Sequence, residues 1–172
     1  APFPAGNSGC QLFLSYGFGS TTPPWLGAYT PFAGVGTGEA PRVQYNVFYD
    51  EFVLFYINAV TGQLRWMRAP AATGVWGPDD DVSGVEGAMF RHLGGVVFDP
   101  LTGIGLLTAT KDDGTPRNVI WQIGLKRTPL GAYDATVALP AGAPLEEHIT
   151  YSRFGTARAP DGRILLAYSR TF

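Results

Sequence analysis

One pattern occurs twice in this chain, as Phe98-Asp-Pro-Leu-Thr-Gly-Ile-Gly-Leu-Leu107 and again as Arg158-Ala-Pro-Asp-Gly-Arg-Ile-Leu-Leu-Ala-Tyr-Ser169. In both copies a strand-like segment runs into a cluster of Asp, Pro and Gly, and an apolar segment follows. Asp, Pro and Gly supply the backbone conformations that tight turns require. The two stretches therefore predict two β-hairpins of the same design.

The order of strand, turn and strand continues around these hairpins. The further strand-like segments lie at 11–16, 28–32, 43–49, 52–57, 63–68, 119–125 and 133–139. Each unit then holds four short antiparallel strands in roughly fifty residues, a period that indicates a repeat architecture. The second strand of each unit is a nearly continuous apolar run, which indicates burial on both faces. No stretch keeps a helical apolar pattern over three turns.

We therefore expect a single all-β domain over residues 1–172, built from three four-stranded antiparallel, propeller-like repeats. The expected parts are an N-terminal arm at 1–9, a repeat at 41–88, a repeat at 89–147, and a repeat in which 10–37 completes 150–172. A repeat completed by both ends of the chain would close the arrangement of repeats.

The repeats resemble the blades of sialidase-like and fucose-lectin-like β-propellers. The two quoted hairpins are similar to the first half of such a blade, and Thr61-Gly-Gln-Leu-Arg-Trp66 with Gly74-Val-Trp-Gly-Pro78 resembles the outer half. The resemblance implies a ring of blades, which usually numbers at least four. Three units therefore predict either assembly of several copies into a larger ring or another architecture, a β-prism or a β-trefoil.

Composition excludes several classes of protein. Charged residues make up only 15% of the chain and the net charge is −2, so the basic footprint of a nucleic-acid-binding protein is missing. No apolar run approaches the length of a membrane span. The single cysteine, Cys10, excludes an intramolecular disulfide. Low charge and the strand edges of three sheets predict a homo-oligomer or a place in a larger assembly.

Motifs of catalysis are absent from the sequence. There is no Gly-x-Ser-x-Gly elbow, and neither the Ser-x-Asp-x-Gly-x-Thr-Trp box nor the Arg-Ile-Pro motif of sialidases occurs. Asp79-Asp80-Asp81 is the densest carboxylate cluster and could hold Ca²⁺, but it lacks the alternation of an EF-hand loop. We interpret the cluster as a solvated turn, and we expect no enzyme, no metal and no cofactor.

Aromatic and arginine side chains remain as candidates for ligand recognition. Sugars present flat C–H faces that stack on tryptophan, while arginine bonds their hydroxyls, and tryptophan combines apolar area with a polar handle. The candidate ligand-binding residues are Trp66, Trp76, Arg65, Arg68, Trp25 and Trp121. Strand alternation at 63–68 places Trp66 and Arg68 on one face and Arg65 on the other. The alternative interpretation is that these tryptophans pack between repeats.

The fucose-lectin resemblance implies an arginine paired with a glutamate, and the sequence shows no glutamate in register with Arg65 or Arg68. Three hypotheses of function follow. The first is a non-catalytic, lectin-like β-propeller that binds a glycan or glycoprotein. The second is a structural or host-attachment component of a larger assembly such as a phage virion. The third is a degenerate sialidase-like hydrolase. The first two favour a location outside the cell or on a virion surface.

Overall fold

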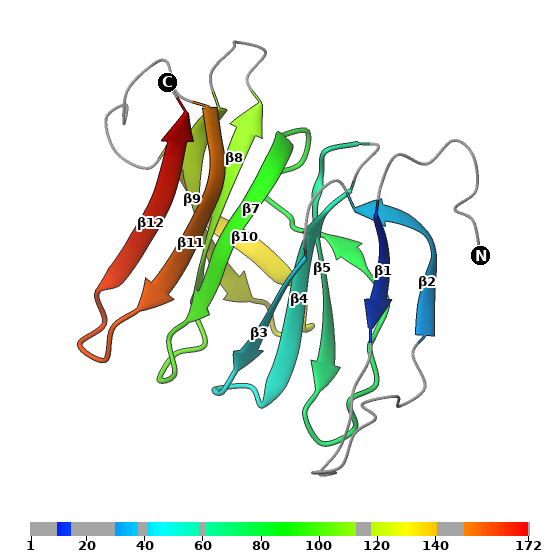
Figure 1. The fold of residues 1–172 in the computed structure, drawn as a ribbon. Coiled ribbons are helices and arrows are strands. Elements are labelled where there is room, and N and C mark those ends of the chain that lie inside the picture. The colour runs from blue at the N-terminus through cyan, green and yellow to red at the C-terminus, as the bar shows by residue number, and fades with distance from the viewer. Residues whose placement is uncertain are drawn as a thin grey trace, which may run out of the picture.

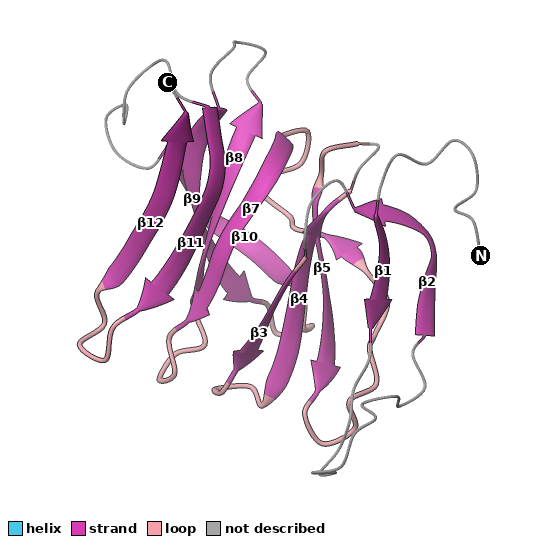
Figure 2. Cartoon of the chain, in the orientation of Figure 1, coloured by secondary structure: helices cyan, strands magenta, loops and turns pink. Residues whose placement is uncertain are grey.

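The computed structural model describes residues 10–14, 30–37, 41–58, 61–112, 118–140 and 150–171. Throughout these ranges the chain forms β-strands joined by turns (Figure 2). In this part of the chain no helix is long and apolar enough to cross a membrane. The expected arm at 1–9 and the candidate Trp25 lie outside the described residues.

The strands form four antiparallel sheets. The N-terminal pair is β1 (Cys10–Leu14) and β2 (Thr30–Thr37). The first full sheet is β3 (Arg42–Asn46), β4 (Glu51–Ile57), β5 (Leu64–Pro70) and β6 (Asp80–Asp81). The second full sheet is β7 (Met89–Phe98), β8 (Gly105–Asp112), β9 (Asn118–Arg127) and β10 (Tyr133–Pro140). The C-terminal pair is β11 (Thr150–Arg158) and β12 (Ile164–Thr171).

Figure 1 shows these sheets in a row, with the C-terminal pair at one end and the N-terminal pair at the other. The all-β expectation is confirmed, and two four-stranded antiparallel sheets are present. The sheet expected from 10–37 and 150–172 does not form within the chain, because the two full sheets stand between its halves. Across the described residues the row does not close into a ring (Figure 1).

The hairpin turns explain the pattern that repeats in the sequence. Gly103 and Gly162 have φ angles of 69° and 88°, in the left-handed region that glycine occupies at little cost. Their amides donate to the carbonyls of Asp99 and Ala159 and so close the turns. Asp50 holds the same place in the β3–β4 turn, with a φ angle of 52°. Local turn chemistry thus sets the register of all three hairpins.

The main core lies between the two full sheets. Phe55 and Trp66 from the first sheet and Phe98 from the second surround the ring of Tyr133. Their ring centroids lie 5.9, 5.4 and 5.8 Å from that of Tyr133, within the range of favourable aromatic pairs. This aromatic cluster joins the two sheets face to face.

The C-terminal pair packs on the opposite face of the second full sheet. Thr108 and Thr156 hydrogen-bond through their hydroxyls at 2.7 Å, and Arg158 forms an ion pair with Asp99 at 2.9 Å. Gly95 makes the close approach possible, because a Cβ there would lie 2.7 Å from the Cβ and backbone nitrogen of Thr156. The contact therefore depends on the absence of a side chain at position 95.

We predict that Gly95→Ala lowers the free energy of unfolding by about 1–3 kcal/mol, because the added methyl forces β11 away from β7. The matched control is Gly77→Ala, whose Cβ would meet only the Arg68 carbonyl at an ordinary 3.5 Å. The control should stay within about 0.5 kcal/mol of the wild type. Urea unfolding of both variants measures the difference, and equal stabilities would contradict this packing.

Candidate functional site

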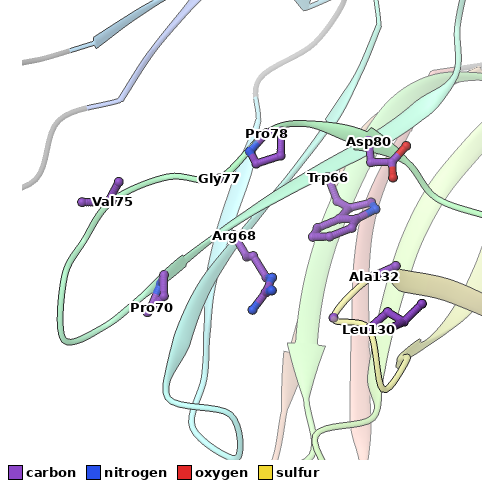
Figure 3. Close-up of a pocket in the computed structure, with 10 residues that line it drawn as sticks. Trp66, Arg68, Pro70, Val75, Gly77, Pro78, Asp80, Leu130 and Ala132 are labelled. Atoms are coloured by element: carbon purple, nitrogen blue, oxygen red, sulfur yellow. The ribbon is translucent and has the colours of Figure 1, made fainter.

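A groove opens at the boundary between the two full sheets. It has a volume of about 330 Å³, at the small end of the range for ligand pockets. The first full sheet supplies one side through β5, β6 and the segment between them, and the turn before β10 supplies the other. Figure 3 shows this arrangement. The residues used below are Trp66, Arg68, Pro78, Asp80, Leu130 and Ala132.

Local sequence builds the two walls. Strand alternation places Trp66 and Arg68 on the same face of β5, and pairing of Trp66 with Asp80 brings the chain back as β6. On the other wall, Gly131 adopts a φ angle of 92° in the turn before β10. A Cβ at Gly131 would lie 2.6 Å from Arg68 Nη2, so glycine makes room for the guanidinium.

Glu51 anchors Arg68 from beneath the groove. Its carboxylate is only 2% exposed, and its Oε2 lies 3.1 Å from Arg68 Nη1. Oε1 accepts a 2.8 Å hydrogen bond from the Tyr133 hydroxyl and lies 3.1 Å from Arg127 Nε. The Arg68 side chain is 33% exposed, so one guanidinium is both fixed by a buried partner and accessible from the groove.

Tyr133 and Asn46 complete this buried network. Asn46 Nδ2 donates to the Tyr133 hydroxyl at 3.0 Å and to the Gly103 carbonyl at 3.2 Å. Burial, and then the hydrogen bond to Glu51, raise the pKa of Tyr133 far above the ordinary value of a tyrosine. Both side chains are fully buried, so the network supports the groove from below.

Trp66 forms a wall of the groove but offers little surface to a ligand. Only 6% of the residue is exposed, and its indole packs edge-on against the ring of Tyr133. The indole Nε1 donates to the Asp81 carbonyl at 3.2 Å. Trp66 and Arg68 lie on the same face of the strand, as predicted. Of these two residues, Arg68 is the one that a ligand can reach.

Arg65 and Trp76 belong to the opposite face of the first full sheet. Arg65 forms ion pairs with Asp79 at 3.1 Å and with Asp81 at 3.4 Å. Trp76 is half-buried and packs on the buried cluster of Leu54, Tyr56 and Met67. Both candidates therefore lie away from the groove.

The remaining candidates are dispersed. Trp121 is half-buried at the margin of the main core. Two of the three carboxylates in the Asp79–Asp81 cluster face Arg65, and Asp80 lines the groove. Among the residues that the structure describes, no group of three or more His, Cys, Asp or Glu side chains could hold a metal ion.

Two residues of the site, Glu51 and Leu130, were missed from the sequence, whereas Asp80 was singled out only as part of the carboxylate cluster. The first is Glu51, which the β4–β5 register places opposite Pro70 and on the face of Arg68. A signal existed, since Glu51 opens an otherwise apolar strand and buried glutamates are almost always paired. Leu130 carries no local signal, although it is 95% exposed on the rim.

Alkaline pH tests the burial of two tyrosines. Burial, and then a hydrogen bond to Asp79, raise the pKa of Tyr56 in the same direction as that of Tyr133. An unfolded tyrosine loses its proton near pH 10, whereas these two keep theirs in the folded state. Stability should therefore be unaffected by them below about pH 10. It should fall above that pH by about 1.4 kcal/mol per pH unit for each tyrosine.

Urea unfolding between pH 9 and pH 11 measures this slope. Tyr133→Phe should remove the share of one tyrosine, and the double variant with Tyr56→Phe should remove the share of two. A slope that is identical in all three proteins would show that these hydroxyls ionise as readily in the folded state as in the unfolded state.

Comparisons with known proteins do not assign the chain to a family. No family model matches the sequence, and no curated protein matches it. No solved structure matches the fold.

Proposed function

We propose that this chain is a non-catalytic carbohydrate-recognition protein that binds a glycan in the groove between its two full sheets. The observation that carries the proposal is the state of Arg68, which is held by the buried Glu51 carboxylate while a third of its side chain stays exposed. A guanidinium has five N–H donors in a fixed fork. An anchored fork presents donors to sugar hydroxyls at little cost in side-chain entropy.

The groove supplies the other contacts that a sugar ring needs. Leu130, Pro78 and Ala132 offer apolar surface for the C–H face of a ring, and Asp80 offers an exposed carboxylate that accepts from hydroxyls. Glycosidases use two carboxylic acids that flank the scissile bond. Of the two carboxylates at this described site, Glu51 is engaged by two arginines and a tyrosine. The arrangement supports binding without hydrolysis.

The same proposal interprets the four sheets as parts of a β-propeller. The first strands of successive sheets are neighbours, since β7 contacts β3 on one side and β11 on the other. This order is what blades around an axis require. The N-terminal and C-terminal pairs then correspond to the outer and inner halves of a third blade.

A structural or attachment role in a larger assembly is the second candidate. It is favoured by apolar side chains that one chain leaves exposed, among them Val43, Val47 and Phe48 at 51%, 53% and 49%. Exposed apolar patches mark surfaces that a partner covers. A glycan array separates the candidates, because only the recognition protein should retain defined sugars.

We predict that groove substitutions weaken binding to the best glycan of the array. Leu130→Ala removes apolar area and should lower affinity about fivefold or more, as should Asp80→Asn if its carboxylate accepts from a hydroxyl. The matched control is Leu101→Ala, which changes a residue that is 81% exposed on a turn outside the groove. Isothermal titration calorimetry gives the affinities, and circular dichroism checks folding.

Three outcomes would overturn the proposal. A folded protein that retains no glycan supports the structural role instead. Groove variants that bind as tightly as Leu101→Ala would place the site elsewhere. Cleavage of the bound glycan, seen by mass spectrometry, would favour the hydrolase hypothesis.

A further inference from the structure

We propose that a second copy of this chain docks its C-terminal pair on the outward face of the first full sheet, the face turned away from the second full sheet. The contact would complete a four-stranded sheet in the order β11–β12–β1–β2, with two strands from each copy. This inference goes beyond glycan binding and does not depend on it.

The outward face is covered over only half of its width. Leu54, Tyr56 and Met67 on β4 and β5 are fully buried there. On the same face, toward β3, Val43, Tyr45 and Phe52 are 51%, 38% and 39% exposed. Cross-strand pairs on this face join Val43 to Leu54, Tyr45 to Phe52 and Leu54 to Met67. The bare surface is therefore continuous with a surface that is already buried.

The positions equivalent to Tyr45 in the β7–β8 and β11–β12 hairpins contact a neighbouring sheet. Tyr45, Phe98 and Arg158 each pair with the residue two positions after the left-handed residue of their turn. Phe98 is 8% exposed and packs in the core against the first full sheet, and Arg158 forms its ion pair with Asp99 of the sheet before it. Tyr45 holds the same place on the outward face of the first full sheet and is 38% exposed.

The C-terminal pair carries the complementary surface. One of its faces contacts the second full sheet through Thr156 and Arg158. The opposite face exposes Ala157, Leu165 and Ala167, and Leu165 is 63% exposed. Ala157 lies directly across the strand pair from Leu165. A small apolar surface on the C-terminal pair thus suits the bulkier aromatic surface on the outward face of the first full sheet.

Strand edges give a second, independent reason for this occupant. In both full sheets the second strand pairs with a third, as β4 does with β5 and β8 with β9. Within the described residues β12 pairs only with β11, and β1 pairs only with β2. Unpaired strand edges present rows of N–H and C=O groups that template pairing with another chain. Two strands from each end add up to the four of a full sheet.

The contact joins different surfaces of the two copies, so it is a head-to-tail interface. Such interfaces close into rings when the rotation between copies allows it. In such a ring, β11 of one copy would lie beside β3 of the next copy. Neighbouring copies would then pack on each other as neighbouring sheets pack within one chain.

Light scattering after size-exclusion chromatography tests the interface with two single variants. Phe52→Glu places a charge on the outward face, and Leu165→Glu places one on the C-terminal pair. Both positions are exposed in the single chain, so folding should persist, and circular dichroism checks it. The wild type should be an oligomer, and each variant alone should have the mass of a monomer.

Mixing the two variants provides the decisive measurement. An equimolar mixture should give a dimer, because the intact outward face of Leu165→Glu fits the intact C-terminal pair of Phe52→Glu. The matched control Leu130→Glu, whose side chain is 95% exposed on the groove rim, should keep the mass of the wild type. A monomeric wild type at micromolar concentration, single variants that keep the wild-type mass, or a mixture that stays monomeric would overturn the proposal.

Discussion

The buried carboxylate of Glu51 is the constraint on which the relation of the two full sheets depends. Glu51 belongs to the first sheet, whereas two of its three partners, Arg127 and Tyr133, belong to the second. Breaking a buried charge pair typically costs about 3–5 kcal/mol, because the remaining charge stays unpaired away from water. The sheets are therefore held in one register, and the position of Arg68 at the groove follows from the same carboxylate.

The second full sheet uses one face toward the first full sheet and the other face toward the C-terminal pair. Aromatic packing around Tyr133 makes the first of these contacts, and the threonine pair with the Arg158 ion pair makes the second. Because the relation is directional, a row of sheets has two unlike ends. The exposed aromatic surface near Tyr45 and the open edge of β12 are consequences of this polarity.

Some aromatic and charged residues around the groove are used in packing or ion pairs, and others remain accessible to a ligand. Trp66 is buried in the core, and Arg65 is paired with Asp79 and Asp81. Arg68 differs because its partner lies beneath it, which leaves the outer side of the guanidinium accessible. Recognition at this groove would thus depend on an anchored arginine and an exposed leucine rim, with tryptophan in a supporting role.

The sequence by itself determined the local features: the all-β class, the hairpin turns with Gly103 and Gly162, and the alternation that puts Trp66 and Arg68 together. These features depend on backbone preferences over a few residues, so a short stretch specifies them. Only the tertiary structure decided the Glu51–Arg68 pair, the place of Leu130 on the groove, and the separation of the N-terminal and C-terminal pairs. The Glu51–Arg68 pair depends on the register between β4 and β5. The other two relations join residues far apart in the chain and are set by packing between sheets.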